Sequence, residues 1–276
     1  MSLLRKFIDL LYPPRCLLCR AFIASGSLCD TCFSSFKKLV TPVCPICGGP
    51  FLNGIQEDHV CEECLRNRPY FDSAVSPYMY DGRIMDAIHL FKYQGKPHIA
   101  KALGPLLASF AKERLSGLRG LLIMPVPLHP KRLRQRGYNQ SLLLARHVAV
   151  GMRASLDFMA LRRTKDTKVQ TGLGRDERRR NMKSAFEVAD RRAVRGKTVL
   201  LVDDVATTGS TLNECAKALR KARSGNVHCL VLARAPKQHE RISNIEHRIS
   251  NVEVNQDERQ CPMINVRFPK DRNVTL

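Results

Sequence analysis

Four pairs of cysteines near the start of the chain restrict its fold more than any other feature of the sequence. Each pair has two intervening residues, and nine, eleven and thirteen residues separate successive pairs. Two thiolates at this spacing hold one side of a tetrahedral zinc ion, and a second pair completes the site. The predicted ligands of two four-cysteine sites are Cys16, Cys19, Cys29, Cys32, Cys44, Cys47, Cys61 and Cys64.

Structural zinc explains these pairs better than disulfide bonds or a redox dithiol. Disulfides need an export route, which the sequence does not show, and a redox dithiol needs one pair beside a βαβ pattern. Gly48 and Gly49 follow Cys47, where a zinc knuckle needs a residue that tolerates positive φ. Sequential pairing gives two small zinc ribbons, and a cross-braced arrangement satisfies the same spacing. Four thiolates leave no open position for substrate, so both zinc ions are predicted to be structural.

Strands and helices alternate after this cysteine-rich region. The run at 198–204, TVLLVDD, is apolar without alternation, as expected for a strand covered on both faces. Such alternation favours a mostly parallel α/β sheet. We predict strands at 71–80, 120–127, 185–188, 198–204 and 227–235, and helices at 82–92, 97–115, 138–152 and 210–222. The predicted division is an N-terminal helix and double zinc ribbon (1–69), an α/β domain (70–235) and a disordered tail (236–276), which is polar and aperiodic.

The charge balance is strongly basic, with 46 Lys and Arg against 25 Asp and Glu and a net charge of +21. Such a field attracts nucleic acid, acidic lipid and phosphorylated small molecules alike, so its sign does not choose among them. An apolar stretch near the start, from Leu3 to Leu11, is interrupted by Asp9 and is too short to span a bilayer. We therefore predict a cytoplasmic protein with no membrane span.

The stretch LLVDDVATTGST at 200–211 is the strongest candidate for a functional site. Ligands bind beyond the carboxyl ends of parallel strands, and backbone N–H groups of a loop that opens a helix form a seat for a phosphate. Two carboxylates repel a phosphate, but they accept hydrogen bonds from the 2′- and 3′-hydroxyls of a ribose whose 5′-phosphate lies in that loop. We predict Asp203 and Asp204 as the catalytic pair, with phosphate-seat residues Val205, Ala206, Thr207, Thr208, Gly209, Ser210 and Thr211. The alternative is a solvated acidic turn before a capped helix.

This stretch resembles the phosphoribosyl pyrophosphate (PRPP) signature of type I phosphoribosyltransferases. The chain from Cys16 to about Arg234 resembles the ComF family, bacterial competence-associated proteins with a zinc module ahead of such a domain. The resemblance implies a type I phosphoribosyltransferase-like α/β fold, with a mostly parallel sheet and flanking helices, preceded by a small cysteine-rich zinc-ribbon module. Besides the cysteine pairs and VDDVATTGST, it is carried by IHLFKYQGK (88–96), PVPLHPKRLRQRGYNQS (125–141) and TKVQTGLGRDERRRNMKSAF (167–186).

The resemblance also implies PRPP as ligand, with Mg²⁺ bridging its pyrophosphate oxygens and ribose hydroxyls. A pyrophosphate-binding loop is expected after the first core strand, at Pro125 to His129, and the segment 162–183 is expected to form a mobile lid. The arginines near the loop equally fit a solvated face or a patch that holds polynucleotide. The loop adds Pro127, Leu128, His129 and Arg136 to the predicted PRPP-binding residues.

Two functions of different classes follow from these features. One is a PRPP-binding phosphoribosyltransferase, or a degenerate form of one, that transfers or senses phosphoribosyl groups. The other is a non-catalytic protein that handles single-stranded DNA with its basic surface and zinc ribbons, because ComF relatives are associated with DNA uptake during natural transformation. Single-stranded DNA and the competence machinery are then the expected partners. Aromatic residues make up only 6 % of the chain and do not alternate with basic ones, so base stacking is not expected.

Overall fold

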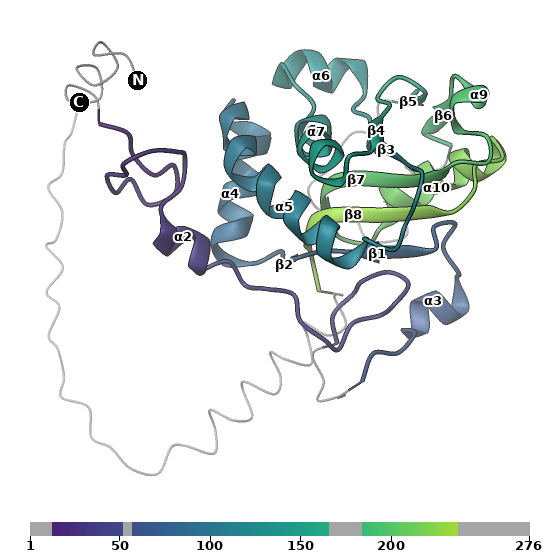
Figure 1. The fold of residues 1–276 in the computed structure, drawn as a ribbon, viewed down its shortest axis with the longest axis horizontal. Coiled ribbons are helices and arrows are strands. Elements are labelled where there is room, and N and C mark those ends of the chain that lie inside the picture. Colours follow the sequence, from purple (N-terminus) through teal and green to yellow (C-terminus); the bar gives the residue numbers. More distant parts are fainter. Residues whose placement is uncertain (1–12, 52–56, 166–183, 237–276) are drawn as a thin grey trace, which may run out of the picture. The chain divides into compact units, whose positions relative to one another are not determined.

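A parallel sheet of six strands forms the centre of the protein in the computed structural model (Figure 1). The structure describes residues 13–51, 57–165 and 184–236; the predicted N-terminal helix, most of the predicted lid and the tail after 236 lie outside them. The strand order is β1-β8-β7-β3-β4, with β2 also paired to β8, and every pair in this sheet is parallel. The strands are β1 (Ser73–Val75), β2 (Tyr78–Met79), β3 (Leu121–Pro125), β4 (Ser155–Leu156), β7 (Thr198–Ala206) and β8 (Val227–Arg234).

Strand β7 lies between β3 and β8 and is buried on both faces, as its unbroken apolar run predicts. Val199 and Leu201 pack into one core, and Leu200 and Val202 pack into the other. Successive side chains of a strand point to opposite faces, so one apolar strand supplies both cores. The strand continues two residues beyond its predicted end at 204, because Val205 and Ala206 pair with β8.

Helices cover both faces of this sheet (Figure 1). Residues of α4, α5 and α7 share one core with β7, and residues of α10 share the other. The predicted strand at 71–80 is split into β1 and β2, because Pro77 lies between them and has no N–H to donate. The helices are α4 (Gly82–Tyr93), α5 (Ala100–Arg114, after a 3₁₀ turn at Pro97–Ile99), α7 (Gln140–Met152) and α10 (Ser210–Lys221).

Smaller elements complete the fold. Helix α6 (Pro130–Arg136) is absent from the sequence prediction, because it buries no residue and so carries no apolar periodicity. Beside the main sheet, β5 (Leu161–Arg163) and β6 (Phe186–Val188) form an antiparallel pair, and the short helix α9 (Arg191–Val194) follows. Among the described residues, no helix combines the length and apolar character needed to cross a bilayer.

The cysteine-rich segment packs on both faces of the sheet. Cys16 and Cys32, the latter on α2 (Asp30–Ser34), belong to the core formed by α4, α5 and α7. The second group of four, which includes Cys64 on α3 (Glu62–Arg66), belongs to the core formed by α10. Gly48 has a φ of +63°, as predicted for a knuckle, and a Cβ there would collide with the Ala74 carbonyl oxygen of β1. The zinc-ribbon segments are therefore built into the hydrophobic cores of the sheet.

Candidate functional site

Asp203 and Asp204 lie near the carboxyl end of β7 and have different surroundings. Asp203 is partly exposed; its Oδ1 accepts hydrogen bonds from the Ser141 hydroxyl at 2.7 Å and the Asp204 N–H at 2.9 Å. Asp204 is only 5 % exposed, and its Oδ1 lies 2.9 Å from the Lys92 ammonium. The two acids are therefore not a free pair open to solvent: one is held by a hydroxyl, the other by a cation.

Burial and charge change the protonation of this group of residues. Burial, and then the neighbouring charge of Asp204, raise the pKa of Asp203 to about 7, although Lys92 and the Ser141 hydrogen bond act against the rise. Burial lowers the pKa of Lys92, but attraction to Asp204 and Asp203 outweighs it, so the pKa of Lys92 lies above its ordinary value. A carboxyl group that titrates near neutral pH, beside a second acid that is paired with a half-buried cation, is typical of a functional site.

Lys92 reaches the acids because the end of α4 is fixed against the start of α7. The Tyr138 hydroxyl donates to the Phe91 carbonyl oxygen at 2.6 Å, and the Gln140 amide donates to the same oxygen at 3.3 Å. Ser141, one residue further along α7, then contacts Asp203. Neither Lys92 nor Ser141 is among the site residues predicted from the sequence, although both lie in segments that carry the resemblance to the ComF family.

The predicted phosphate seat is a turn between β7 and α10. Gly209 has a φ of +78° and immediately precedes the first residue of α10, a conformation that favours glycine. The Thr208 and Ser210 hydroxyls lie 2.8 Å apart, and the Ser210 N–H donates to the Thr208 hydroxyl at 3.3 Å. The N-terminus of α10 therefore opens on a turn lined with N–H groups and hydroxyls, which suits an anion.

A buried arginine lies behind this turn. Arg234, at the carboxyl end of β8, is 3 % exposed and donates from Nη1 to the Thr207 carbonyl oxygen at 2.8 Å. Its Nε has no hydrogen-bond partner among the described residues, and no carboxylate within them forms an ion pair with it. A buried charge is costly unless it is paired, so this guanidinium points to an anionic ligand at the turn. The position of Arg234 at the carboxyl end of a predicted strand, where ligands bind, is the sequence signal that could have identified it as a site residue.

The predicted pyrophosphate loop, Pro125 to His129, begins at the last residue of β3. Pro127, Leu128 and His129 are partly exposed, and the His129 ring accepts from the Lys131 N–H at 3.3 Å, which caps α6. Arg136, at the end of α6, donates to the Gln140 side chain at 3.2 Å and lies 5.2 Å from the centre of the Tyr93 ring. Gln140 precedes Ser141, which contacts Asp203, and Tyr93 follows Lys92, which contacts Asp204. Arg136 therefore contacts the neighbours of both residues that hold the acidic pair.

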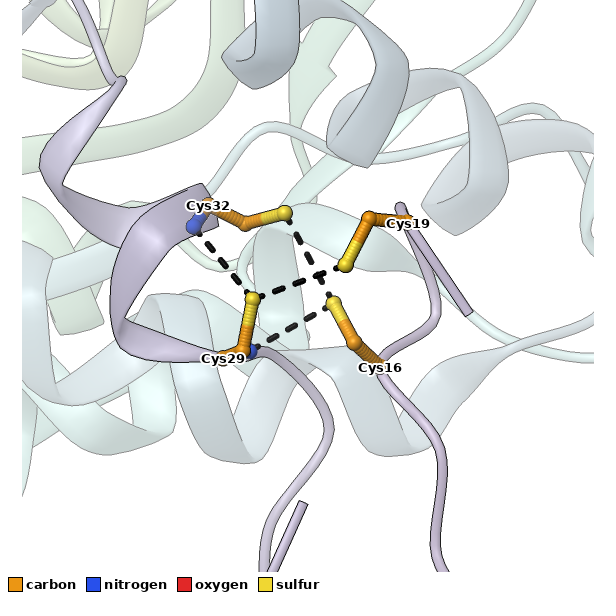
Figure 2. Close-up of side chains that lie close together, drawn as sticks. All are labelled: Cys16, Cys19, Cys29 and Cys32. Atoms are coloured by element: carbon orange, nitrogen blue, oxygen red, sulfur yellow. Dashed lines mark hydrogen bonds between the residues drawn. The ribbon is translucent and has the colours of Figure 1, made fainter. Parts of the chain in front are cut away.

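The cysteines form two groups of four in sequential order, which excludes the cross-braced arrangement. The sulfur atoms within each group lie within 4.8 Å of one another, and Figure 2 shows the thiols of the first group pointing toward a common centre. Backbone N–H groups donate to sulfur at Cys16, Cys29 and Cys44, at 3.4 to 3.5 Å. Such bonds stabilise thiolates, the form that binds metal. Each group therefore fits one tetrahedral zinc ion; the second is fully buried.

Together, the fold and these sites define a class of protein: a double zinc ribbon joined to a phosphoribosyltransferase-like parallel sheet. The double zinc ribbon domain family matches residues 7–65, and the phosphoribosyl transferase domain family matches residues 139–262. Competence protein F of Haemophilus influenzae is 35 % identical over 80 % of this chain and 97 % of its own length. The chain belongs to the ComF family.

Other relatives agree with this assignment. DNA utilization protein YhgH of Escherichia coli (strain K12) is 34 % identical over 79 % of this chain and 96 % of its own. Competence protein ComFC of Bacillus subtilis is 26 % identical over 75 % of this chain and 84 % of its own. Glutamine PRPP amidotransferase from B. subtilis is similar over 49 % of this chain and 26 % of its own, at 19 % identity and a TM-score of 0.35.

Proposed function

We propose that the protein binds PRPP at the carboxyl edge of its sheet and transfers or senses phosphoribosyl groups. The observation that carries this proposal is the turn at 207–211, with buried Arg234 behind it and partly exposed Asp203 just before it. The 5-phosphate would accept from the N–H groups and hydroxyls of the turn, and its charge would compensate Arg234. The ribose hydroxyls would donate to the carboxylates.

The acidic pair must change its contacts when the sugar binds. Asp203 is exposed enough to accept a ribose hydroxyl, whereas Asp204 is covered and bound to Lys92. Lys92 would therefore leave Asp204 and face the anionic ligand. The loop at 125–129 and Arg136 would face the pyrophosphate. Mg²⁺ bound together with the ligand would supply positive charge that stabilises the leaving group.

Calorimetric titration with PRPP and Mg²⁺ tests this proposal. Wild type should bind, and the double variant Asp203→Asn/Asp204→Asn should not. Arg234→Gln should bind at least tenfold more weakly, since it loses a charge-assisted contact of about 1.5 to 3 kcal/mol. Asp86→Asn is the matched control, because Asp86 is an exposed carboxylate on α4 whose ion-pair partner among the described residues is Arg83. Equal affinity of wild type and the double variant would refute the site.

A second function, the handling of single-stranded DNA, is favoured by a separate observation. Relatives named for competence and DNA utilization match most of this chain, and the chain carries a net charge of +21. We propose that single-stranded DNA binds through its phosphates. Its affinity should therefore fall steeply as salt rises, and a lack of measurable affinity at low salt would refute this function.

A further inference from the structure

A groove of about 660 Å³ lies at the amino edge of the sheet, opposite the PRPP site proposed above. Its walls are the segments that lead into β3, β4 and β7 and the carboxyl ends of α5 and α7. In parallel strands the amino ends all meet at one edge and the carboxyl ends at the other. The groove is therefore a separate site.

Four cationic side chains line this groove. Lys112 comes from the last turn of α5, and Arg119, Arg153 and Lys197 come from the segments before β3, β4 and β7. All four are exposed, and the lining contains no carboxylate and no aromatic side chain. Within the part of the chain that the structure describes, none of the four forms an ion pair.

The order of the strands places these cations in a row. Strand β3 lies between β4 and β7; Leu121 pairs with Thr198, and Leu122 with Ser155. Neighbouring strands are about 4.8 Å apart, so the residues that precede them line the edge at similar intervals. Arg195 and Arg223 extend the row toward β8, because Arg195 bridges Ser224 and the Gly196 N–H donates to the Arg223 carbonyl oxygen.

We propose that this groove binds the backbone phosphates of single-stranded DNA. This proposal rests on the second function proposed above. A row of cations without acids matches a chain of phosphates, and the lack of aromatic side chains excludes base stacking in the groove. Binding is therefore independent of sequence and sensitive to salt. A flexible single strand enters a recess between helix ends and the sheet edge, which a stiff duplex does not follow.

The test compares two triple variants that remove equal charge. The groove variant is Lys112→Gln/Arg119→Gln/Lys197→Gln. The control is Arg68→Gln/Lys101→Gln/Arg146→Gln, made at exposed positions outside the groove lining. Both lower the net charge from +21 by three, so their long-range fields are matched. Affinity for fluorescent oligothymidylate is measured by anisotropy against salt concentration, and thermal unfolding verifies that both variants are folded.

The groove variant should lose about three phosphate contacts. At a slope of about 0.7 per contact, its plot of log affinity against log salt should flatten by about 2, and its affinity at 0.1 M salt should fall about 100-fold. The control should change the slope by less than 1. An equal loss of affinity for oligothymidylate in both variants would overturn the groove as the binding surface. If wild type failed to bind at low salt, DNA binding itself would be overturned, and this outcome is distinguishable from the first.

Discussion

Replacing Asp203 by Asn should make the ligand-free protein more stable. Asp203 has a pKa of about 7 in the folded protein against an ordinary 3.8, because its removal from water and then the charge of Asp204 disfavour its ionised form. In the unfolded chain it ionises near 3.8, so the folded state is penalised once the pH exceeds that value, and the penalty grows until about pH 7. At 1.36 kcal/mol per pKa unit, it reaches about 4 kcal/mol at pH 8 and is less than half of that at pH 5.

Asparagine resembles the protonated acid, since it keeps an oxygen that accepts from Ser141 and carries no charge. The Asp203→Asn variant should therefore gain about 4 kcal/mol of unfolding free energy at pH 8 and less than half of that at pH 5. Urea unfolding at both pH values, with zinc and without PRPP or Mg²⁺, measures this difference. Zinc-linked effects of pH cancel, because variant and wild type share both cysteine clusters.

The matched control is Asp86→Asn, whose exposed ion pair with Arg83 spans 3.7 Å. Its stability should change by less than about 0.5 kcal/mol at either pH. The Asp203→Asn variant would contradict this prediction if it were no more stable than wild type at pH 8, or if its unfolding free energy rose equally at both pH values. Either result would show that the ionised Asp203 carboxylate does not destabilise the folded protein. Asp203 would then not be a carboxylate retained for ligand binding at a cost in stability.

Two further predictions concern the cation beside the acids and the zinc clusters. Lys92→Met should lower the unfolding free energy by about 3 kcal/mol, measured by urea unfolding at pH 8, because it leaves Asp204 buried and unpaired. The raised pKa of Lys92 keeps the wild-type ammonium charged at this pH. A loss of less than about 0.5 kcal/mol would contradict the pairing. Elemental analysis should find about two zinc ions per chain in wild type and about one in each of the single variants Cys19→Ser and Cys44→Ser. Cys44→Ser should lose more stability than Cys19→Ser, because all four thiols of its cluster are buried.

The sequence predicts those parts of the fold that depend on short-range patterns. The spacing of the cysteines predicts both clusters, because a knuckle is a local structure. The unbroken apolar run predicts β7, because a strand covered on two faces needs no polar side chain. Helix α6 is not predicted in this way, because all its residues are at least partly exposed and it has no apolar face. Only Pro130 and the His129 cap mark its start.

The composition of the candidate site depends on contacts between distant segments. Lys92 and Asp204 are more than 100 residues apart, and their pairing follows from the contact of Tyr138 with the end of α4. Nothing near Asp204 in the sequence indicates that a cation neutralises it. Arg234 likewise becomes informative only when β8 is placed next to β7, which brings its guanidinium to the Thr207 carbonyl oxygen.

The same strand connects the two proposed ligand sites. Lys197 lies before the amino end of β7, and Asp203 lies near its carboxyl end. Six residues of extended chain span about 20 Å, at about 3.3 Å per residue. That distance exceeds the Debye length of about 8 Å at physiological ionic strength, so charges at one exposed edge are screened from those at the other. Any influence of PRPP on DNA binding must therefore pass through a change in structure, and β7 is the strand that joins the two sites.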